Sequence, residues 1–328
     1  MDAKLLDRLF NSFKAQKIAV IGDFALDFYF NLQTNTNEFS VETEKEVFHA
    51  HSPKSSLGGA GNVCKNLAHL GVNPYAFGII GQDLFGREML HQMDQLHIDY
   101  SNIFIEDTKG TPVYSKPMEG PIEFNRIDFG TTDIVDETTK AGFLFQTCLQ
   151  LHNYDGIILN EQFLHPLLSS EDIKSLEEEI VSSNLFAIAD FRSLGKHSKN
   201  VILKINLTEF SHVIGIPVNQ LSDIKIIQTQ VKKLLKLRNK GILLTLGEMG
   251  IMYADQTKIV HEPALPVKGT IDTVGAGDMV VAAFASAMLA GASESEACQF
   301  ANLCAHLSIH KIGETGSANW DEIMKFNK

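Results

Sequence analysis

A run of small residues ends in a carboxylate and leads directly into an apolar segment. The stretch GTIDTVGAGD, which ends in Asp278, is followed at once by MVVAAFASAMLA. A glycine turn that opens a helix presents unpaired backbone N–H groups, and the positive end of the helix dipole, to the space in front of it. Because Gly275 and Gly277 have no side chains, an anion can approach the backbone closely. The sequence therefore predicts an anion hole formed by Gly275, Ala276 and Gly277.

The carboxylate of Asp278 is expected to point into the space that the anion fills. A carboxylate beside a phosphate is the arrangement that accepts the proton of an attacking hydroxyl during phosphoryl transfer. The alternative is a plain glycine turn in which Asp278 only caps the helix. The turn alone leaves both interpretations open.

Two common nucleotide motifs are missing from the sequence. There is no G-x-x-x-x-G-K-[ST] motif of a P-loop, and the first apolar strand is followed by GDFALD rather than by G-x-G-x-x-G. A different way of holding phosphate is required.

Short apolar runs alternate along the chain with segments long enough for helices. Residues 3–15 are amphipathic and predict a helix, and Lys17–Gly22 (KIAVIG) predicts a buried strand. Runs without polar alternation are typical of parallel strands that are covered on both faces. The pattern predicts one doubly wound α/β domain over residues 1–328, with a mostly parallel sheet flanked by helices. The further predicted strands are Tyr75–Ile80, Gly156–Leu159, Phe186–Ala189, His212–Ile216 and Ile242–Leu246.

Two segments interrupt this alternation. Leu26–Leu32 and Glu46–His51 are strand-like on either side of a polar stretch, and Gly110–Ile127 is strand-like with Pro and Gly interruptions. Such short strands favour a small antiparallel β flap, or lid, over a site. We expect the lid to consist of residues 25–52 and 110–127, inserted in the single domain.

Five motifs in this order resemble those of the ribokinase-like (PfkB) carbohydrate kinases. They are GDFALD (22–27), LGGAGN (57–62), KINLTE (204–209, the N-x-x-E pattern), TLGEMG (245–250) and DTVGAGD (272–278). The resemblance implies the ribokinase-like fold and an ATP-dependent transfer of phosphate to a sugar hydroxyl. Because several ordered motifs are more specific than one, the resemblance favours the catalytic interpretation of Asp278.

Within this family the sequence is most similar to the D-glycero-D-manno-heptose-7-phosphate kinase branch. The similarity lies in the GGAGN spacing, in TPVYSK (111–116) and in NRID (125–128). Two positions depart from the branch. Phe28 follows Asp27 where arginine is usual, and Asn160-Glu161 stand where an aspartate-tyrosine pair is usual.

The resemblance assigns roles to the residues on the phosphate side. Asp278 would be the catalytic base, although a helix start favours a low pKa, because placing the hydroxyl matters more than basicity in a loose transition state. Asn206 and Glu209 would organise Mg²⁺, with Glu209 acting through water. Asp272 would lie near a monovalent cation such as K⁺. The ATP side would also include Thr245, Gly247, Gly250 and Asn302.

On the acceptor side, Asp27 resembles the carboxylate that accepts hydrogen bonds from two sugar hydroxyls. Gly58, Gly59 and Asn62 would lie beside it, and Asp23 is an alternative contact. If the acceptor already carries a phosphate, a cation should meet its far end. The candidates are Lys116, Arg126 and Arg192, each of which also fits an ordinary surface charge.

Composition limits the partners of this chain of 328 residues. The formal net charge of −12 repels the phosphate backbone of nucleic acids. The sequence shows no uninterrupted apolar stretch of membrane-spanning length and no secretory signal pattern at its start. The four cysteines are scattered, which fits a reducing cytoplasm. By analogy with the family, we expect a homodimer that forms through the lid.

Two other functions stay open. The chain could be a catalytically silent regulator that binds a sugar or nucleotide, although the intact Asp278 argues against this. It could also be a nucleoside kinase of the same fold, which an apolar, aromatic acceptor pocket would favour.

Overall fold

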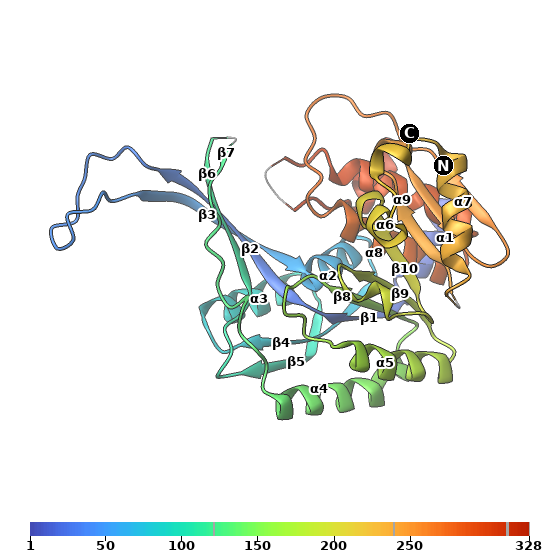
Figure 1. The fold of residues 1–328 in the computed structure, drawn as a ribbon, viewed down its shortest axis with the longest axis horizontal. Helices are drawn as coiled ribbons and strands as arrows, with labels where there is room; N and C mark the ends of the chain where they lie inside the picture. The colour runs from blue at the N-terminus through green and yellow to red at the C-terminus, as the bar shows by residue number, and fades with distance from the viewer. Residues whose placement is uncertain (121, 239, 313–314, 328) are drawn as a thin grey trace.

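The computed structural model describes residues 1–120, 122–238, 240–312 and 315–327. Within them the chain forms a large nine-stranded sheet with helices on both faces and a smaller four-stranded sheet (Figure 1). Across the large sheet the strands are, in order, β13 (Ile259–Glu262), β12 (Ile251–Ala254), β11 (Ile242–Thr245), β10 (Ile202–Asn206), β9 (Phe186–Phe191), β8 (Gly156–Glu161), β1 (Lys17–Gly22), β4 (Asn73–Gly81) and β5 (Asp99–Glu106).

All pairs from β5 to β11 are parallel, and only β12 and β13 pair antiparallel. The strands are buried on both sides, because successive side chains point to opposite faces. In β1, Ile18 and Val20 belong to one apolar cluster, and Ala19 and Ile21 belong to the other. The predicted doubly wound, mostly parallel sheet is confirmed.

Helices supply the remaining apolar residues of each cluster. On one face lie α1 (Ala3–Phe13), α2 (Ala60–His69), α3 (Leu84–Gln95), α8 (Ala276–Leu289), α9 (Glu294–Ser308) and α10 (Trp320–Phe326). On the other lie α4 (Glu137–Gln150), α5 (Ser170–Ser182), α6 (Leu207–Ile214) and α7 (Ile224–Leu235). None of the helices in the described ranges is both long and apolar enough to cross a membrane.

One predicted strand is wrong. The apolar run His212–Ile216 is the end of helix α6 and the turn that follows it, and the strand lies earlier, at Ile202–Asn206. Asn206 and Glu209 form a capping box that starts the helix, and Gly215 ends it with a positive φ of 68°. The run is therefore part of an amphipathic helix.

The smaller sheet lies in the two regions predicted as insertions, although one of its strands continues past residue 52 to Gly59. Its strands are, in order, β3 (His49–Gly59), β2 (Phe24–Gln33), β6 (Val113–Glu119) and β7 (Ile122–Glu123). It consists of two antiparallel pairs, β2 with β3 and β6 with β7, which meet along a parallel pairing of β2 with β6. The β2–β3 hairpin extends well beyond the body of the molecule (Figure 1).

The order of the strands also predicts where a ligand binds. Strand β1 has β4 on one side and β8 on the other, so the direction of winding changes there. In open α/β sheets, ligands bind outside the carboxyl ends of the strands at such a point. Gly22, Asn160 and Asp190 lie side by side across the ends of β1, β8 and β9.

Candidate active site

A cleft of about 610 Å³ lies between the smaller sheet and the carboxyl ends of the large sheet. This volume suits a small-molecule substrate. Residues from four of the five sequence motifs line it together, although they are far apart in the chain. Of the predicted site residues, the cleft contains Asp27, Gly59, Lys116, Arg126, Arg192, Asn206, Glu209, Gly275, Gly277 and Asp278.

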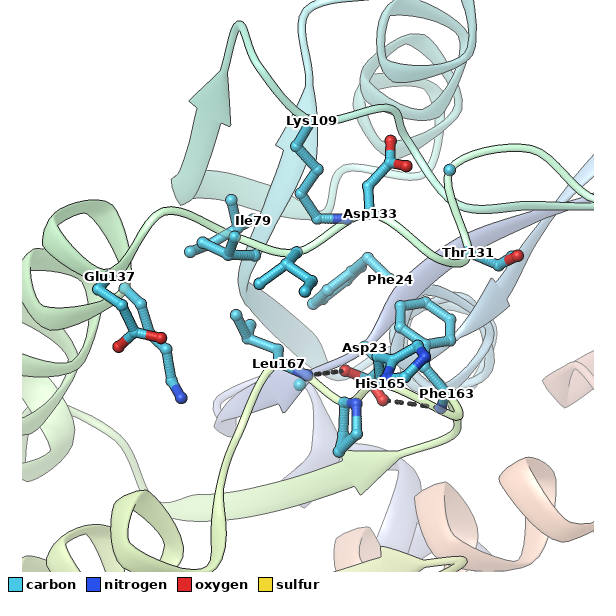
Figure 2. Close-up of a pocket in the computed structure, with 16 residues that line it drawn as sticks. Asp23, Phe24, Ile79, Lys109, Thr131, Asp133, Glu137, Phe163, His165 and Leu167 are labelled. Atoms are coloured by element: carbon cyan, nitrogen blue, oxygen red, sulfur yellow. Dashed lines mark hydrogen bonds between the residues drawn. The ribbon is translucent and has the colours of Figure 1, made fainter.

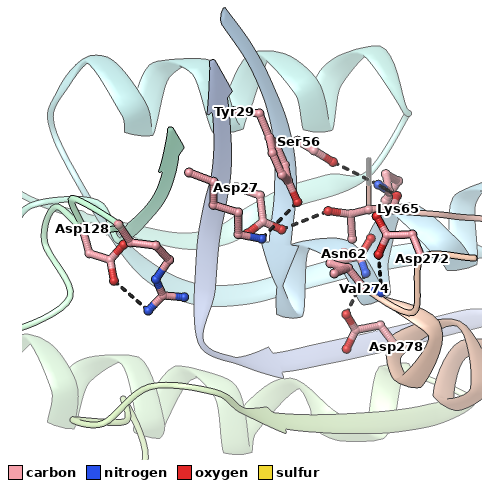
Figure 3. Close-up of polar contacts among 12 residues, drawn as sticks. Asp27, Tyr29, Ser56, Asn62, Lys65, Asp128, Asp272, Val274 and Asp278 are labelled. Atoms are coloured by element: carbon pink, nitrogen blue, oxygen red, sulfur yellow. Dashed lines mark hydrogen bonds and ion pairs between the residues drawn. The ribbon is translucent and has the colours of Figure 1, made fainter. Parts of the chain in front are cut away.

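Asp278 lies in the first turn of α8, which starts at Ala276 after Gly275. Its Oδ2 accepts a hydrogen bond of 2.6 Å from Asn62 Nδ2 of α2 (Figure 3). Among the described residues, no side-chain hydrogen bond caps the start of α8, so Asp278 does not act as a helix cap. Desolvation by burial, and then the neighbouring Asp190 carboxylate, raise the pKa of Asp278 to about 6. This corrects the low pKa expected from the helix start, because burial outweighs the helix dipole.

Neighbouring atoms lie so close to the two glycines of this turn that a Cβ at either position would collide with them. Gly275 has a φ of 79°, and a Cβ there would lie 2.6 Å from Thr315 Cγ2 and 2.9 Å from Asn62 Nδ2. A Cβ on Gly277 would lie 2.8 Å from Lys204 Nζ. The turn therefore has no room for a side chain at Gly275 or Gly277 without a shift of these neighbours.

Asp27 lies on β2 and faces the cleft from the smaller sheet (Figure 3). Its Oδ2 accepts from Thr315 Oγ1 at 3.0 Å, and its Oδ1 is 3.4 Å from Lys116 Nζ. Lys116 also donates to Tyr29 Oη at 3.0 Å. Burial alone would lower the pKa of Lys116, but the Asp27 carboxylate and the Tyr29 hydroxyl raise it. The charge of Lys116 is thus already paired with Asp27.

The alternative acceptor contact, Asp23, is occupied by backbone groups. One of its carboxylate oxygens accepts from Leu167 N at 2.8 Å, and the other accepts from Gln162 N at 2.8 Å and Phe163 N at 3.0 Å. Figure 2 shows it at the edge of a second pocket, of about 80 Å³, which also holds the buried Lys109. Asp23 therefore fixes the loop after β8, and Asp27 is the better candidate.

The two N-terminal glycines hold the start of α2 against these aspartates. Gly59 has a φ of 56°, and a Cβ there would lie 2.4 Å from Asp23 O. A Cβ on Gly58 would lie 3.2 Å from Asp27 Oδ2. Asn62 is fully buried, and its Oδ1 has no hydrogen-bond partner in the described part of the chain.

Asn206 and Glu209 lie at the junction of β10 and α6. Asn206 Oδ1 accepts from Glu209 N at 2.8 Å, and Glu209 Oε2 accepts from Asn206 N at 2.8 Å. The capping box uses one oxygen of the Glu209 carboxylate and leaves Oε1 for a ligand, since no described residue donates to it. One carboxylate oxygen in a phosphate cleft suits Mg²⁺, which keeps most of its ligands as water and phosphate oxygens.

Two arginines lie at the acceptor end of the cleft. The Arg126 guanidinium forms an ion pair of 2.9 Å with Asp128 and lies 4.8 Å from the centre of the Tyr114 ring. Arg192 Nη1 donates to Gln162 O at 3.0 Å. A guanidinium has five N–H donors, so each can still bind an anion.

Four residues predicted for the ATP side lie outside the lining of the cleft: Thr245, Gly247, Gly250 and Asn302. Thr245 ends β11 next to Asn206 of β10, and Gly247 follows in the turn. Gly250 has a φ of 96° and a Cβ there would meet Glu262 O at 2.1 Å. Asn302 Nδ2 donates to Glu262 O at 3.1 Å and Pro263 O at 3.2 Å. The contacts of Gly250 and Asn302 hold α9 and the turn before β12 against β13.

Asp272, the predicted cation residue, precedes the glycine turn. Its Oδ1 accepts from Val274 N at 3.0 Å, and its backbone N donates to Ile309 O at 2.8 Å. It thus ties the turn to the end of α9.

Among the cleft residues that sequence patterns missed are Asp190, Lys204 and Thr315. Asp190 and Lys204 form a buried ion pair of 2.8 Å. The sequence offered one signal, a lysine inside an otherwise apolar strand. Thr315 belongs to no motif, and the fold brings it to Asp27 from 288 positions away.

Fold and cleft together define a phosphotransferase that acts on an alcohol group, since a glycine turn at a helix start and a carboxylate face a polar pocket. The pfkB family carbohydrate kinase model matches residues 15–321. The chain therefore belongs to that family, and the resemblance found in the sequence is confirmed.

Two curated relatives match most of this chain at low identity. The bifunctional protein HldE of Helicobacter acinonychis (strain Sheeba) is 26% identical over 317 residues, which cover 94% of this chain and 65% of that protein. HldE of Sulfurimonas denitrificans is 29% identical over 304 residues, which cover 90% of this chain and 61% of that protein. The chain thus spans less than two thirds of the length of these relatives.

Solved structures support the fold. Arabidopsis thaliana ribokinase, complexed with ribose and ATP, superposes with a TM-score of 0.75 at 21% identity, covering 96% of this chain and 99% of the ribokinase. Phosphofructokinase-2 from Escherichia coli, in complex with potassium, gives a TM-score of 0.74 at 16% identity, covering 94% and 97%. The ribokinase-like fold predicted from the sequence is confirmed.

Proposed function

We propose that this chain transfers the γ-phosphate of Mg-ATP to a hydroxyl of a sugar that already carries a phosphate, with Asp278 as the base. The observation that carries the proposal is the set of residues that line the cleft of about 610 Å³. It holds Asp278 beside a helix start, Asp27 on the opposite sheet, and the cations Arg126 and Arg192 at the acceptor end.

The proposed reaction is a direct transfer. The acceptor hydroxyl, held by Asp27, attacks the γ-phosphorus and forms the new O–P bond. The bond between that phosphorus and the β–γ bridging oxygen breaks, and its electron pair leaves with ADP. The hydroxyl proton passes to the carboxylate of Asp278, and the N–H groups of Gly275, Ala276 and Gly277 bind the developing charge.

Mg²⁺ fits the cleft through Glu209 and Asn206. Glu209 keeps one carboxylate oxygen outside the capping box, and Asn206 is held beside it. Bound there through water, Mg²⁺ would neutralise charge on the ATP phosphates. Glu209 orients this water, and Thr245 and Gly247 lie nearby for the rest of the nucleotide.

Electrostatics favours a phosphorylated acceptor. Lys116 is paired with Asp27, and Lys204 is paired with Asp190 on the floor of the cleft, so both ammonium groups already have a carboxylate partner. Arg126 is paired with Asp128 but remains half-exposed, and Arg192 bonds only to a backbone oxygen among the described residues. Their remaining donors match the oxygens of a phosphate.

Heptose 7-phosphate is the first acceptor to test, because the HldE relatives and the sequence patterns point to the same branch. The two positions that depart from that branch do not line the cleft. The Phe28 ring packs against Phe30 and Phe85, and Glu161 accepts from the backbone of Ser193 and Leu194. Asn160 is also outside the lining of the cleft, but it lies beside Asp190 across β8 and β9, and its buried side-chain atoms have no hydrogen-bond partner among the described residues.

The polar lining disfavours the nucleoside alternative. Tyr114 and Phe163 lie in the cleft, but Asp27, Gln162 and Arg126 dominate its acceptor end. A silent regulator is disfavoured because Asp278, Glu209 and the glycine turn are all intact.

We further propose that the smaller sheet, residues 25–52 and 110–127, acts as a lid and joins two copies of the single domain. Phe39, Val41 and Phe48 are exposed on the projecting hairpin. We also propose that a monovalent cation such as K⁺ binds near Asp272. The four cysteines are unpaired, which supports a cytoplasmic location.

The experiment measures ADP release with sugars offered in pairs, with and without a terminal phosphate. The pairs are heptose with heptose 7-phosphate, fructose with fructose 6-phosphate, and ribose with ribose 5-phosphate. We expect kcat/KM to favour the phosphorylated member by at least about 10-fold. Arg126→Gln should remove most of this preference, and the surface variant Arg8→Gln should keep it. Equal use of both members by the wild-type enzyme would refute the phosphorylated acceptor.

A further inference from the structure

An ion pair lies on the floor of the cleft. Lys204 of β10 and Asp190 of β9 are direct partners in the parallel pairing, and Nζ lies 2.8 Å from Oδ2. Their side chains are only 7% and 6% exposed, yet both line the cleft. Replacing such a buried pair with apolar residues is often neutral for folding or even stabilising. Stability therefore does not explain why the pair is there.

The position of the ammonium relates it to the reacting phosphate. Lys204 Nζ is so close to the glycine turn that a Cβ on Gly277 would lie 2.8 Å from it. Asp278 is the next residue along the chain after Gly277. The ammonium therefore lies directly beneath the predicted anion hole.

The ammonium has donors left. It has three N–H groups, and among the described residues Asp190 is the acceptor that it contacts. Two donors therefore remain for a ligand. Asp190 fixes the side chain, so the charge is held in place before a substrate arrives, which is the condition for strong electrostatic catalysis.

We propose that Lys204 is a catalytic residue that donates to the phosphoryl group during its transfer, and that Asp190 is its positioning residue. The proposal rests on the proposed function for the reaction itself. As the bond to ADP breaks and the bond to the acceptor oxygen forms, the phosphoryl oxygens stay bound to Lys204 and to the N–H groups of the turn. The proton of the acceptor still goes to Asp278.

The test compares Lys204→Met, Lys204→Arg, Asp190→Asn and the double variant Lys204→Met/Asp190→Asn. Lys204→Met should lower kcat by about 100-fold or more and leave both KM values within about 3-fold, because the contact is strongest in the transition state. The variant should also bind the complex of MgADP with aluminium fluoride at least about 10-fold more weakly and bind MgADP alone unchanged. Lys204→Arg keeps the charge and should retain more kcat than Lys204→Met.

The double variant separates catalysis from folding. It removes both buried charges, so its Tm should recover relative to Lys204→Met while kcat stays low. The matched control is Lys140→Met, which breaks another ion pair of 2.8 Å, with Asp172, outside the lining of the cleft. A kcat of Lys204→Met within about 3-fold of wild type, or a kcat restored in the double variant, would overturn the proposal.

The outcome is independent of the acceptor. All variants are assayed with whichever sugar the wild-type enzyme uses best. If that sugar lacks a phosphate, the proposed acceptor is wrong, but the Lys204 comparison is still decided by kcat. If Arg126→Gln changes acceptor preference while Lys204→Met leaves kcat intact, the proposed function stands and the role of Lys204 is refuted.

Discussion

At the scale of single residues, Asp278 is defined by the charges around it. Burial and the carboxylates of Asp190 and Asp27 raise its pKa, while Asn62 and Lys204 lower it, and the balance is about 6. A base with this pKa is ionised at neutral pH and still accepts a proton readily.

This balance predicts the pH dependence of the reaction. In the proposed reaction the ionised carboxylate is the base, so kcat/KM should fall as the pH drops through about 6, by about tenfold per pH unit below it. Asn62→Ala removes a hydrogen bond to the charged form and should move the midpoint to higher pH. A pH–rate profile from pH 5 to 9 measures both. A midpoint below pH 5 in the wild type would contradict the raised pKa.

The same shift predicts an effect on stability. Since the pKa of Asp278 is higher in the folded protein than its ordinary value of 3.8, folding favours the protonated acid. That stabilisation is complete below pH 3.8 and is lost as the pH rises through about 6. Asp278→Asn resembles the protonated acid, so its Tm should exceed that of wild type at pH 8 and approach it at pH 5. Calorimetry at the two pH values checks the sign, and a variant less stable at pH 8 would contradict it.

Residue types and spacing pointed to Asp278, Asp27 and Glu209 because each stands in a local motif. They did not reveal that Asn62 donates to Asp278, or that Asp190 and Lys204 lie beneath the turn. Such contacts join strands and helices that are distant in sequence. They depend on register and sheet order, which no single motif contains.

At the scale of elements, the start of α6 serves both folding and the site. Asn206 and Glu209 cap the helix reciprocally, and Asn319 and Glu322 form the same capping box on α10, away from the cleft. The two boxes therefore give a matched comparison.

Asn206→Ala and Asn319→Ala should each lower the free energy of unfolding by about 1 kcal/mol, since each loses an N-cap. Only Asn206→Ala should also raise the Mg²⁺ concentration needed for half-maximal activity, by several-fold. Denaturant unfolding and Mg²⁺ titrations of activity measure the two effects. An equal change in Mg²⁺ dependence in both variants would argue against a role for Asn206 near the metal.

The wrong prediction of a strand at His212–Ile216 arose because the run was interpreted apart from the helix to which it belongs. The run is short and apolar, and such runs do not distinguish a strand from part of a helix. Asn206 and Glu209, whose capping box starts the helix, also match the N-x-x-E pattern of metal binding, which hides their capping role in the sequence. The strand that was missed, Ile202–Asn206, is interrupted by Lys204, whose charge is accommodated only because Asp190 lies opposite.

At the scale of the whole molecule, the projecting hairpin predicts the oligomeric state. Phe39, Val41 and Phe48 are 62%, 99% and 53% exposed. If a second copy covers them, Val41→Glu should raise the dimer dissociation constant at least tenfold, or about 1.4 kcal/mol. Val181→Glu, on α5, is the control. Sedimentation equilibrium gives the constants, and a wild-type chain that stays monomeric at high concentration would contradict the lid dimer.

The overall charge of −12 is compatible with phosphate ligands because binding depends on the cleft. Cations and carboxylates line the cleft together. In the proposed site, phosphate is therefore bound by individual groups, namely backbone N–H groups, Lys204 and the two arginines. The net charge predicts that the chain does not bind nucleic acids. It contains no information about how charged residues are arranged in the cleft.

The central claim is that Asp278 serves as the base for phosphoryl transfer to a phosphorylated sugar in this cleft. The most direct measurement follows ATP and heptose 7-phosphate by ³¹P NMR, with wild-type protein and Asp278→Asn side by side. We predict a new phosphate-ester resonance that grows with ADP in the wild type, and a rate about 10² to 10⁴-fold lower in Asp278→Asn. Undiminished ester formation by Asp278→Asn, or ADP formation without a new ester in the wild type, would contradict the claim.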